Sequence, residues 1–360
     1  MKSVKNATVK TMNQMKVCIF GIHGVVGQKM IEVLNERFFK NKGLSEGDLS
    51  PDNIMLVATD KSVENGARSH LIDRFPLTKG LPIIKAIDAI IKKPDIVLMS
   101  AGSEASKKWA KQFVEAGSCV IDNSSAWRMD DDISLVIPGV ADWGVGGSIQ
   151  LISNPNCVAI MVATAIAPLI PFDMSVVAVV ALQSASGAGA KGLEVLDFEE
   201  QMNERLATPN VFPGKLYNNI LPASGKFSSE LYNEEEEKGI HEIQKMFRKN
   251  DFKISFRSLR CPVPYGHVAS LRIKFKKIVS LEKIRNALAI GNNIKYQLEP
   301  FNLEGDVLGH DECFVWGVRH DRNNHKVVEM MVMSDNLRLG AAANAVSIME
   351  KLIENKLIRF

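Results

Sequence analysis

The sequence predicts an α/β protein with two domains, a doubly wound Rossmann-type domain first and an α+β domain second. In the N-terminal part, short β-branched and aliphatic runs alternate with stretches of helical pattern, which is typical of a parallel sheet with helices on both faces. From Met174 onward the rhythm changes and the apolar runs lengthen. The 360 residues, of which 46% are hydrophobic and 24% charged, suffice for two folded cores.

The first element is a strand, Lys16–Phe20, followed at once by a glycine-rich loop and a helix over residues 28–39. Gly21 permits a tight turn, Gly24 lets a pyrophosphate approach the backbone, and Gly27 allows the helix to pack closely on the strand. A glycine pattern alone is weak, and its alternative is a plain turn between strand and helix. The strand before it and the helix after it favour a dinucleotide-binding loop.

Three further strands, Ile54–Ala58, Ile96–Ser100 and Cys119–Asp122, complete the predicted parallel sheet together with a helix over Ser103–Ala116. The small-residue loop 100–103 follows the carboxyl end of a strand, which is where cofactors bind in such sheets.

The segment after the second strand, Thr59–Ser62, selects the form of the cofactor. Asp60 could bind the ribose 2′-hydroxyl of NAD, whereas Lys61 suits the 2′-phosphate of NADP. These residues alone leave the choice open.

Cys157 ends the run Ser153–Cys157, directly before an apolar, helix-like stretch, Val158–Leu169. Asn154 and Pro155 are typical of a turn. A cysteine at a turn-to-helix junction meets backbone N–H groups and the positive end of the helix dipole, which favour the thiolate and can hold an oxyanion. The alternative is that Cys157 is a small buried hydrophobe, as most free cysteines are.

The second half of the chain has longer strands, Val176–Ala181, Phe252–Phe256 and Ser270–Phe275, and a second glycine-rich loop, Ser186–Gly192. That loop does not match a P-loop. A helix is predicted over Glu235–Arg248, where the acidic residues at its start would cap the helix favourably.

Two prolines and a glycine predict an irregular backbone between Arg260 and His267. Arg260 could clamp a carboxylate with two parallel hydrogen bonds. His267 could titrate near neutrality and act as acid or base, although a single loop histidine is more often only solvated.

The composition excludes several classes of protein. The net charge of +3 is small and the basic residues are scattered, so we expect no nucleic-acid partner. Five cysteines without CxxC spacing and seven histidines without an HExxH pair indicate neither a disulfide framework nor a metal site. The N-terminal residues lack the apolar region of a secretory signal, and the apolar stretch 158–170 is shorter than the ~20 residues of a membrane span. We therefore expect a cytoplasmic protein without a membrane partner.

These motifs occur in the order found in aspartate-semialdehyde dehydrogenases, and the sequence resembles that family over nearly all of the chain from Met15. Glyceraldehyde-phosphate dehydrogenases and acetylglutamyl-phosphate reductases share the architecture but not this set of motifs. The set comprises the glycine loop from Gly21, Asp122–Arg128, Ser153–Cys157, Gln183–Gly192, the Glu-x-x-Lys pair Glu235 and Lys238, Arg260–His267 and Asp335–Asn344.

The resemblance implies a role for each catalytic and substrate-binding residue. Cys157 is the nucleophile, His267 the general acid/base, and Gln183 orients the acyl intermediate. Arg260 binds the substrate carboxylate and Glu235 its amino group.

Phosphate is held, on the same resemblance, by Arg128 and Lys238, with Asn156 close by. The position of Glu235 among the four consecutive glutamates 234–237 is open by one residue.

NADP is the cofactor that the resemblance implies. His23 stands where the family usually has threonine, and Lys61 stands where an arginine often meets the 2′-phosphate. The implied cofactor contacts are Gly21, His23, Gly24, Val25, Val26, Gly27, Thr59, Lys61, Ser62, Ser100, Gly102, Ser186, Gly187 and Asn336.

The implied reaction is the NADPH-dependent reductive dephosphorylation of L-aspartyl 4-phosphate to L-aspartate 4-semialdehyde through a Cys157 thioester. It would feed the biosynthesis of lysine and diaminopimelate, methionine and threonine. The alternatives are a reductase of a related acyl phosphate and an inactive homologue that serves as a binding subunit. The presence of Cys157 and His267 disfavours the inactive homologue, while Arg260 with the Glu-x-x-Lys pair favours an amino acid with a free α-carboxylate.

The predicted dinucleotide-binding domain comprises residues 15–156 and 335–360, and the catalytic and dimerisation domain comprises residues 157–334. Residues 1–14 are expected to be a flexible tail. The resemblance implies a homodimer or homotetramer built on the second domain.

Overall fold

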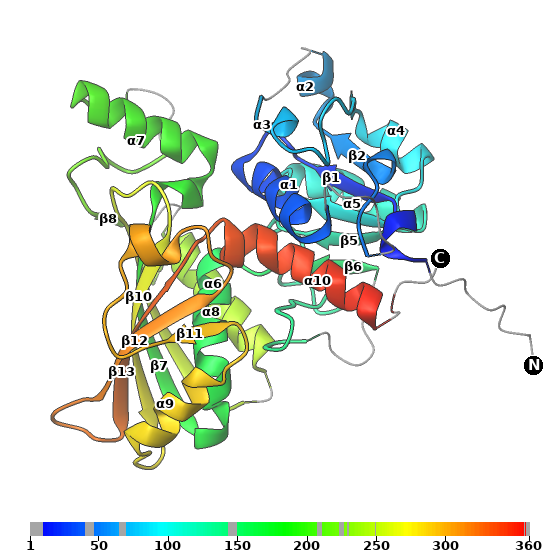
Figure 1. Cartoon of the computed structure of the whole chain (residues 1–360). Helices are drawn as coiled ribbons and strands as arrows, with labels where there is room; N and C mark the ends of the chain where they lie inside the picture. Colours follow the sequence, from blue (N-terminus) through cyan, green and yellow to red (C-terminus); the bar gives the residue numbers. More distant parts are fainter. Residues whose placement is uncertain are drawn as a thin grey trace, which may run out of the picture. The chain divides into compact units, whose positions relative to one another are not determined.

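The computed structural model describes residues 10–39, 47–64, 70–142, 150–206, 211–222, 227–228, 230–248, 250–355 and 357, with the backbone alone for residues 61, 70 and 71. The chain divides into two compact units (Figure 1). The described parts of residues 1–138, 142–154 and 342–360 form the first unit, and those of 139–141 and 155–341 form the second.

The first unit contains a six-stranded parallel sheet in the order β3-β2-β1-β4-β5-β6. This is the strand order of two mononucleotide-binding halves that meet between β1 and β4. The predicted doubly wound domain is confirmed. The strands are β1 (Val17–Phe20), β2 (Ile54–Val57), β3 (Ile83–Ile84), β4 (Ile96–Met99), β5 (Cys119–Asp122) and β6 (Leu151–Ser153).

Helices cover both faces of this sheet, so every residue of its four central strands is buried. Ile19 and Leu56 pack in one apolar cluster with α1 and α10, while Phe20 and Val57 pack in another with α4 and α5. Burial on both sides explains why these strands are continuous apolar runs rather than alternating ones. The helices are α1 (Val25–Phe38), α2 (Asp60–Glu64), α3 (His70–Asp73), α4 (Ala86–Ile91), α5 (Ser103–Glu115), α10 (Ala343–Glu354) and the 3₁₀ turns η1 (Met12–Gln14) and η2 (Pro51–Asn53).

Residues 10–14 belong to the folded first unit. The Lys10 Nζ lies 2.6 Å from the Asp95 carboxylate, and the Asn53 side chain donates to the backbone oxygen of Asn13 at 2.8 Å. The prediction of a flexible tail over 1–14 is therefore wrong for residues 10–14, and its remainder, residues 1–9, lies outside the described residues.

The second unit contains a seven-stranded mixed sheet in the order β11-β12-β13-β10-β7-β9-β8. Neighbouring strands from β12 to β7 are antiparallel, whereas β7 pairs with β9 in parallel. The predicted α+β domain is confirmed. The strands are β7 (Met174–Gln183), β8 (Leu221–Pro222), β9 (Lys253–Arg260), β10 (His267–Phe275), β11 (Ile294–Tyr296), β12 (Cys313–His320) and β13 (Val327–Ser334).

Helices of the second unit pack against this sheet, and the strands alternate between buried and accessible residues. In β10, Ala269, Leu271 and Ile273 are buried, while Ser270 and Arg272 between them are exposed. Such alternation is typical of a sheet with one covered and one open face. The helices are α6 (Cys157–Ile166), η3 (Ala167–Phe172), η4 (Ala185–Ala188), α7 (Ala190–Met202), α8 (Glu234–Met246), α9 (Leu281–Ala289) and the π-helical turns η5 (Leu303–Val307) and η6 (Arg338–Ala342).

The C-terminal segment changes unit near residue 342. The predicted bounds place residues 335–341 with the dinucleotide-binding domain, whereas in the structure these residues belong to the second unit. Asn336 accounts for this placement, because its side-chain oxygen accepts from the Gly266 backbone N–H at 2.8 Å.

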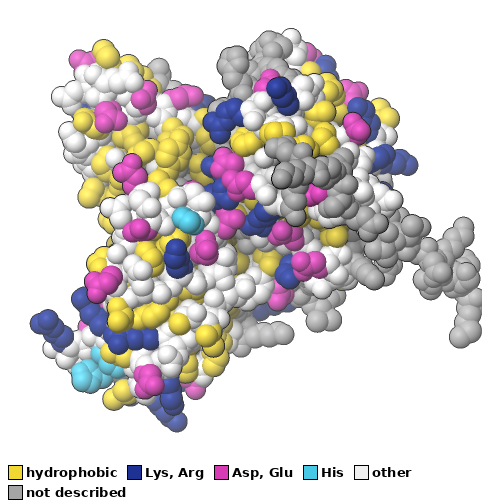
Figure 2. Space-filling model, in the orientation of Figure 1, with side chains coloured by type: hydrophobic (Ala, Val, Ile, Leu, Met, Phe, Trp, Pro, Cys, Tyr) yellow, Lys and Arg dark blue, Asp and Glu magenta, His cyan; other side chains and the backbone are white. Residues whose placement is uncertain are grey.

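Charged side chains are interspersed on the face of the molecule that Figure 2 shows, with acidic and basic groups side by side. Among the described side chains of that face, the basic ones form no continuous stripe. In the part of the chain that the structure describes, no helix is long and apolar enough to cross a membrane.

Candidate active site

Cys157 is the first residue of α6. Asn156 caps this helix, because its side-chain oxygen accepts from the backbone N–H groups of Val158 at 2.9 Å and Ala159 at 3.4 Å. The predicted turn-to-helix junction is confirmed, and it places the half-buried Cys157 thiol at the positive end of the helix dipole. The helix ends at Ile166 and continues as the 3₁₀ helix η3, where Pro168 and Pro171 cannot supply backbone donors.

The thiol of Cys157 faces an imidazole that lies 110 residues later in the sequence of the second unit. The Cys157 Sγ lies 3.2 Å from the Nε2 of His267, which is the first residue of β10 and completely buried. On its other side, the Nδ1 of His267 accepts from the Ser184 backbone N–H at 3.2 Å. Geometry of this kind supports a nucleophile with an imidazole partner rather than a small buried hydrophobe.

Burial and the nearby charge of Arg260 lower the pKa of His267 from 6.5 to about 3, against smaller opposing effects of the Gly266 carbonyl and Glu235. This environment favours the neutral ring. The alternative that His267 is only a solvated loop residue is wrong, because it begins a strand of the sheet and is fully buried.

Arg260 is the last residue of β9 and pairs in register with Gln183 of the neighbouring β7. It is 1% exposed, and its Nη1 donates to the Ser184 backbone oxygen at 2.6 Å. Burial lowers the pKa of its guanidinium from the ordinary value, while the charges of Glu235 and Cys157 oppose that shift. A buried guanidinium beside a carboxylate and a thiol can bind a substrate carboxylate through two parallel bonds.

Glu235 is the glutamate of the 234–237 run that faces this site. It lies 2.7 Å from the Lys238 ammonium and accepts from the Asn156 side-chain amide at 3.2 Å. Burial raises the pKa of Glu235, but the charges of Lys238 and Arg260 and the Asn156 bond outweigh it, so the net shift is downward.

Glu236 makes its hydrogen bonds outside this site, which indicates that Glu235 is the glutamate of the run that faces it. The Glu236 carboxylate accepts from the backbone N–H of Asn233 in a capping box and from that of Ser258. Because α8 starts from this cap, residue 235 rather than 236 points toward Asn156.

Gln183 ends β7, and its amide donates to the Ser258 hydroxyl at 2.7 Å. Its side-chain oxygen is buried and has no hydrogen-bond partner among the described residues. An unpartnered buried acceptor on the residue that pairs with Arg260 suits a substrate that brings its own donor.

Ser186, Gly187 and Asn336, predicted as cofactor contacts, lie in the second unit beside His267. A Cβ on Gly187 would come within 2.6 Å of the Arg260 Nη1 and 3.2 Å of the His267 ring, so only glycine keeps this space open. The Asn336 side chain bonds with the hydroxyls of Ser186 and Ser184 at 3.0 to 3.3 Å.

The remaining predicted contacts lie in the first unit. Gly21 has a φ of +99°, and a Cβ there would be 2.7 Å from the Ser100 backbone. A Cβ on Gly27 would collide with the Gly21 carbonyl, and Gly24 is the N-cap of α1, which begins with Val25 and Val26. These three glycines have the positions that a dinucleotide-binding loop requires.

His23 offers a hydrogen-bonding atom within that loop. Its Nε2 is buried without a partner among the described residues, and burial lowers the pKa of its imidazole, which favours the neutral ring. Gly102, with φ +84°, begins α5 after β4. The Thr59 hydroxyl lies 3.0 Å from that of Ser62, whereas the side chain of Lys61 falls outside the described part of the chain.

Arg128 also belongs to the first unit, whereas Lys238 and Asn156, the other residues predicted at the phosphate, belong to the second unit. It is buried and donates to the Asn123 backbone oxygen at 2.7 Å. The structure thus brings Cys157, Asn156, Gln183, Glu235, Lys238, Arg260 and His267 into one unit and leaves Arg128 with the dinucleotide-binding fold.

Four residues of this site do not follow from sequence reasoning: Ser184, Ser258, Glu242 and Gly340. Glu242 accepts from the Asn156 backbone N–H at 2.5 Å, and a Cβ on Gly340 would lie 2.7 Å from the Cys157 Cβ. Ser184 and Gly340 lie within the motifs Gln183–Gly192 and Asp335–Asn344, so the sequence did offer a signal for these two residues. Ser258 and Glu242 lie in no motif, because only strand pairing and helix packing bring them to the site.

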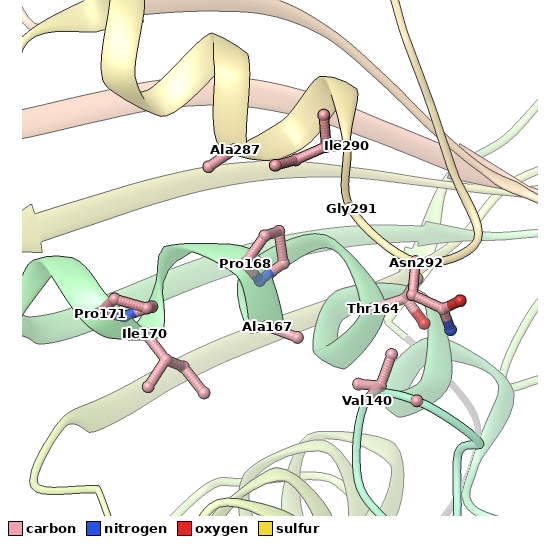
Figure 3. A pocket seen from close by; sticks show the side chains of 11 residues that line it. Val140, Thr164, Ala167, Pro168, Ile170, Pro171, Ala287, Ile290, Gly291 and Asn292 are labelled. Carbon is pink, nitrogen blue, oxygen red and sulfur yellow. The ribbon is translucent and has the colours of Figure 1, made fainter.

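A separate pocket of about 480 Å³ lies in the second unit and contains none of the predicted site residues. Figure 3 shows Thr164, Val140 and Asn292 gathered at one end and Pro171 at the other. The Thr164 hydroxyl is buried without a hydrogen-bond partner among the described residues. The lining consists of Gly139, Val140, Thr164, Ala167, Pro168, Ile170, Pro171, Ala287, Ile290, Gly291 and Asn292.

No group of three or more His, Cys, Asp or Glu side chains within the described ranges could hold a metal ion. The functional groups that the second unit brings together are a thiol, an imidazole, a guanidinium and a carboxylate.

Comparison with known sequences and structures agrees with this architecture. Residues 16–143 match the NAD binding domain of semialdehyde dehydrogenases, and residues 166–339 match the semialdehyde dehydrogenase dimerisation domain. Fold and site together define a nicotinamide dinucleotide-dependent dehydrogenase with a thiol at its centre.

Curated relatives identify the family. The chain is 34% identical over 358 residues to the aspartate-semialdehyde dehydrogenase of Aquifex aeolicus, covering 95% of this chain and 99% of that protein. It is 32% identical over 349 residues to aspartate-semialdehyde dehydrogenase 2 of Vibrio cholerae, covering 95% and 98%. The chain belongs to the aspartate-semialdehyde dehydrogenase family, and the resemblance inferred from its motifs is confirmed.

A solved structure of aspartate semialdehyde dehydrogenase II from Vibrio cholerae has a TM-score of 0.82 at 32% identity, covering 94% of this chain and 98% of that one. A second structure of that enzyme, complexed with ASA, has a TM-score of 0.81 at 30% identity with the same coverage. The fold described above is therefore that of the family.

Proposed function

We propose that the chain catalyses the NADPH-dependent reductive dephosphorylation of L-aspartyl 4-phosphate to L-aspartate 4-semialdehyde through a thioester on Cys157. The single observation that carries this assignment is the 3.2 Å approach of the Cys157 Sγ to the His267 Nε2, within a site that also holds Arg260 and Glu235. The product would supply the biosynthesis of lysine and diaminopimelate, methionine and threonine.

The covalent chemistry follows from the thiol. The Cys157 thiolate attacks the acyl carbon of aspartyl 4-phosphate, and phosphate leaves with the electrons of the broken C–O bond. A thioester is electrophilic enough to be reduced, so one hard step becomes two easier ones. The nicotinamide, when bound, supplies the hydride. Collapse of the thiohemiacetal then releases the semialdehyde and regenerates the thiolate.

The charged groups of the second unit suit an amino-acid substrate. We assign Arg260 to the substrate α-carboxylate, Glu235 to its α-ammonium and the unpartnered oxygen of Gln183 to orientation of the acyl group. The 2.7 Å ion pair with Lys238 holds Glu235 in place, and the Lys238 side chain, which is 32% exposed, is accessible to phosphate. Arg128 is the second phosphate ligand in this assignment.

The choice of substrate distinguishes this proposal from the alternatives. A reductase whose acyl phosphate lacks an α-carboxylate and an α-ammonium would not need Arg260 buried beside Glu235. Burying these charges is costly unless the substrate supplies groups of opposite charge. An inactive homologue would not need a thiol and an imidazole within bonding distance.

The first unit fits a dinucleotide through its glycine loop, the N-terminus of α1 and the unpartnered Nε2 of His23. We propose NADP rather than NAD, because Lys61 is the second residue of α2, the helix that begins soon after β2, and a cation in this segment suits a 2′-phosphate. Lys61→Ala should weaken NADP binding and spare NAD. Equal losses for both would mean that Lys61 does not contact the 2′-phosphate.

The matched dimerisation domain and the open face of the second sheet support a homodimer, with a homotetramer as the larger alternative. Sedimentation of the full chain would distinguish them. The cytoplasmic location stays a prediction.

The assay that tests the function is reduction of NADP by L-aspartate 4-semialdehyde and phosphate, with NAD in parallel. We expect NADP reduction that requires both substrates and is absent in Cys157→Ser. Failure of the wild-type chain to reduce either cofactor would refute the proposed function.

A further inference from the structure

Both ring nitrogens of His267 have a partner, a thiol on one side and a serine on the other. Its Nε2 faces the Cys157 Sγ at 3.2 Å. Its Nδ1 faces the Ser184 backbone N–H at 3.2 Å and the Ser184 hydroxyl at 3.3 Å. All three residues lie in the second unit, and Ser184 and His267 are fully buried.

A backbone N–H can only donate, which fixes the role of the atom opposite. A proton on Nδ1 would point at the proton of the Ser184 amide, so Nδ1 must be the acceptor. A neutral imidazole then carries its proton on Nε2, where it points at the Cys157 sulfur. A doubly protonated ring would break the bond from Ser184.

The Ser184 segment is itself immobilised. The Ser184 backbone oxygen accepts from the Arg260 Nη1 at 2.6 Å, and the Ser184 hydroxyl donates to the Asn336 side-chain oxygen at 3.3 Å. That same oxygen accepts from the Gly266 backbone N–H at 2.8 Å, immediately before His267. Asn336 therefore holds both Ser184, which donates to the ring, and Gly266, the residue before His267.

We propose that the Ser184 backbone amide is a positioning group that keeps His267 as a permanent Nε2–H donor to a Cys157 thiolate. His267 then stabilises negative charge by hydrogen bonding and does not remove the proton of Cys157. The proposal rests on the proposed function and narrows the acid/base role that the family resemblance implies.

The charges around the ring agree with this assignment. Arg260 is a buried cation whose charge acts on both Cys157 and His267, while the nearby Glu235 is paired with Lys238 at 2.7 Å. The amides at the start of α6 add to the positive potential at the sulfur. The guanidinium and the helix terminus stabilise the thiolate, so no imidazolium is needed.

The reaction balances without a proton from His267. When the thiolate adds to a carbonyl carbon, the C–S bond forms and the carbonyl electron pair moves to oxygen. The first adduct, formed with aspartyl 4-phosphate, collapses by expelling phosphate, which takes up a proton from solvent, and a thioester remains. The nicotinamide dinucleotide, when bound, would supply a hydride to that thioester. The resulting second adduct collapses by re-forming the C=O bond, and the sulfur leaves as thiolate. What each step requires at sulfur and oxygen is a hydrogen-bond donor, which the Nε2–H supplies.

Nitrogen-15 NMR of the wild-type, histidine-labelled protein tests the tautomer directly, with the His267 signals assigned by their loss in His267→Gln. We expect an unprotonated Nδ1 and a protonated Nε2 that do not change between about pH 5 and pH 8. A protonated Nδ1, or an imidazolium within that range, would overturn the proposal. This measurement requires no substrate, so its outcome is independent of whether the proposed function is correct.

A pair of variants tests the consequence for catalysis. Glutamine places an amide N–H near the position of Nε2, whereas asparagine places it near Nδ1. We expect His267→Gln to keep a kcat at least about ten times that of His267→Asn, with the wild-type pH profile. Equal losses, or a smaller loss for asparagine, would contradict donation from Nε2. If either variant fails to fold, the wild-type NMR result decides.

Discussion

The two units of this protein build their binding sites in opposite ways. In the first unit, the dinucleotide loop is a single local segment, in which Gly21, Gly24 and Gly27 set the turn, the helix start and the helix packing. In the second unit, Cys157, Glu235 and His267 come from distant parts of the sequence and meet through strand pairing and helix packing. Sequence pattern can therefore predict the glycine loop of the first unit, but for the second site it supplies the residue types without their environment.

The largest effect is expected from replacing Cys157, the proposed nucleophile of the second unit. Cys157→Ser should lower kcat by at least about a thousandfold, because a hydroxyl is a much weaker nucleophile than a thiolate. Steady-state assay and circular dichroism would measure activity and fold together. Cys261→Ser is the matched control, since Cys261 is also a free, half-buried cysteine of the second unit, and it should remain active. Near-normal activity in Cys157→Ser would end the proposal of thiol catalysis.

The two arginines sharpen the comparison, because one lies in each unit. Arg260→Lys keeps the charge but loses the planar fork, so the Michaelis constant for the semialdehyde should rise about tenfold or more. Arg128→Ala should instead raise the Michaelis constant for phosphate. Both constants should be measured in both variants. Exchanged signatures, or loss of cofactor affinity alone, would show that the substrate is placed incorrectly.

Gly27 in the first unit and Gly340 in the second allow the packing around the two sites to be compared. Gly27→Ala would drive a Cβ into the Gly21 carbonyl, so we expect a loss of about 1–3 kcal/mol in the free energy of unfolding and weaker dinucleotide binding. Gly340→Ala would press on Cys157 instead, so kcat should fall while dinucleotide binding persists. Urea denaturation and cofactor titration separate the two. Matching losses of cofactor affinity would mean that the two sites are not built independently.

Acid should weaken the second unit through His267. Its pKa is about 3 in the folded chain against an ordinary value of 6.5. Between these values the unfolded chain binds a proton that the folded chain does not, so stability is retained above about pH 6.5 and declines as the pH falls toward 3. Urea midpoints at about pH 7 and pH 5 should fall farther apart in wild type than in His267→Gln. An equal decline in both would assign the acid sensitivity to other groups.

The smallest effect concerns the pocket of the second unit. Thr164→Val removes a buried hydroxyl that has no partner among the described residues, so the free energy of unfolding should rise by about 1 kcal/mol. Thermal unfolding would measure this, with Thr59→Val as an exposed control. A loss of stability would indicate that the hydroxyl is bonded after all.

The strands of the first unit could be predicted because each is a continuous apolar run, as expected for strands buried on both faces. The order of the second sheet could not, because β7 pairs with both β9 and β10 and nothing local encodes that choice. The register of the four glutamates needed the Asn233 cap, and the character of His267 needed its burial beside Arg260. Environment, rather than residue type, was the missing information.

The central claim is that Cys157 carries the acyl group during turnover. Wild-type protein and Cys157→Ser should be mixed with L-aspartate 4-semialdehyde and NADP without phosphate, quenched in acid and analysed by intact-mass and peptide mass spectrometry. We predict an added aspartyl group on the peptide that contains Cys157 in wild type and its absence in the variant. Cofactor reduction without any adduct, or an adduct on another residue, would contradict the account.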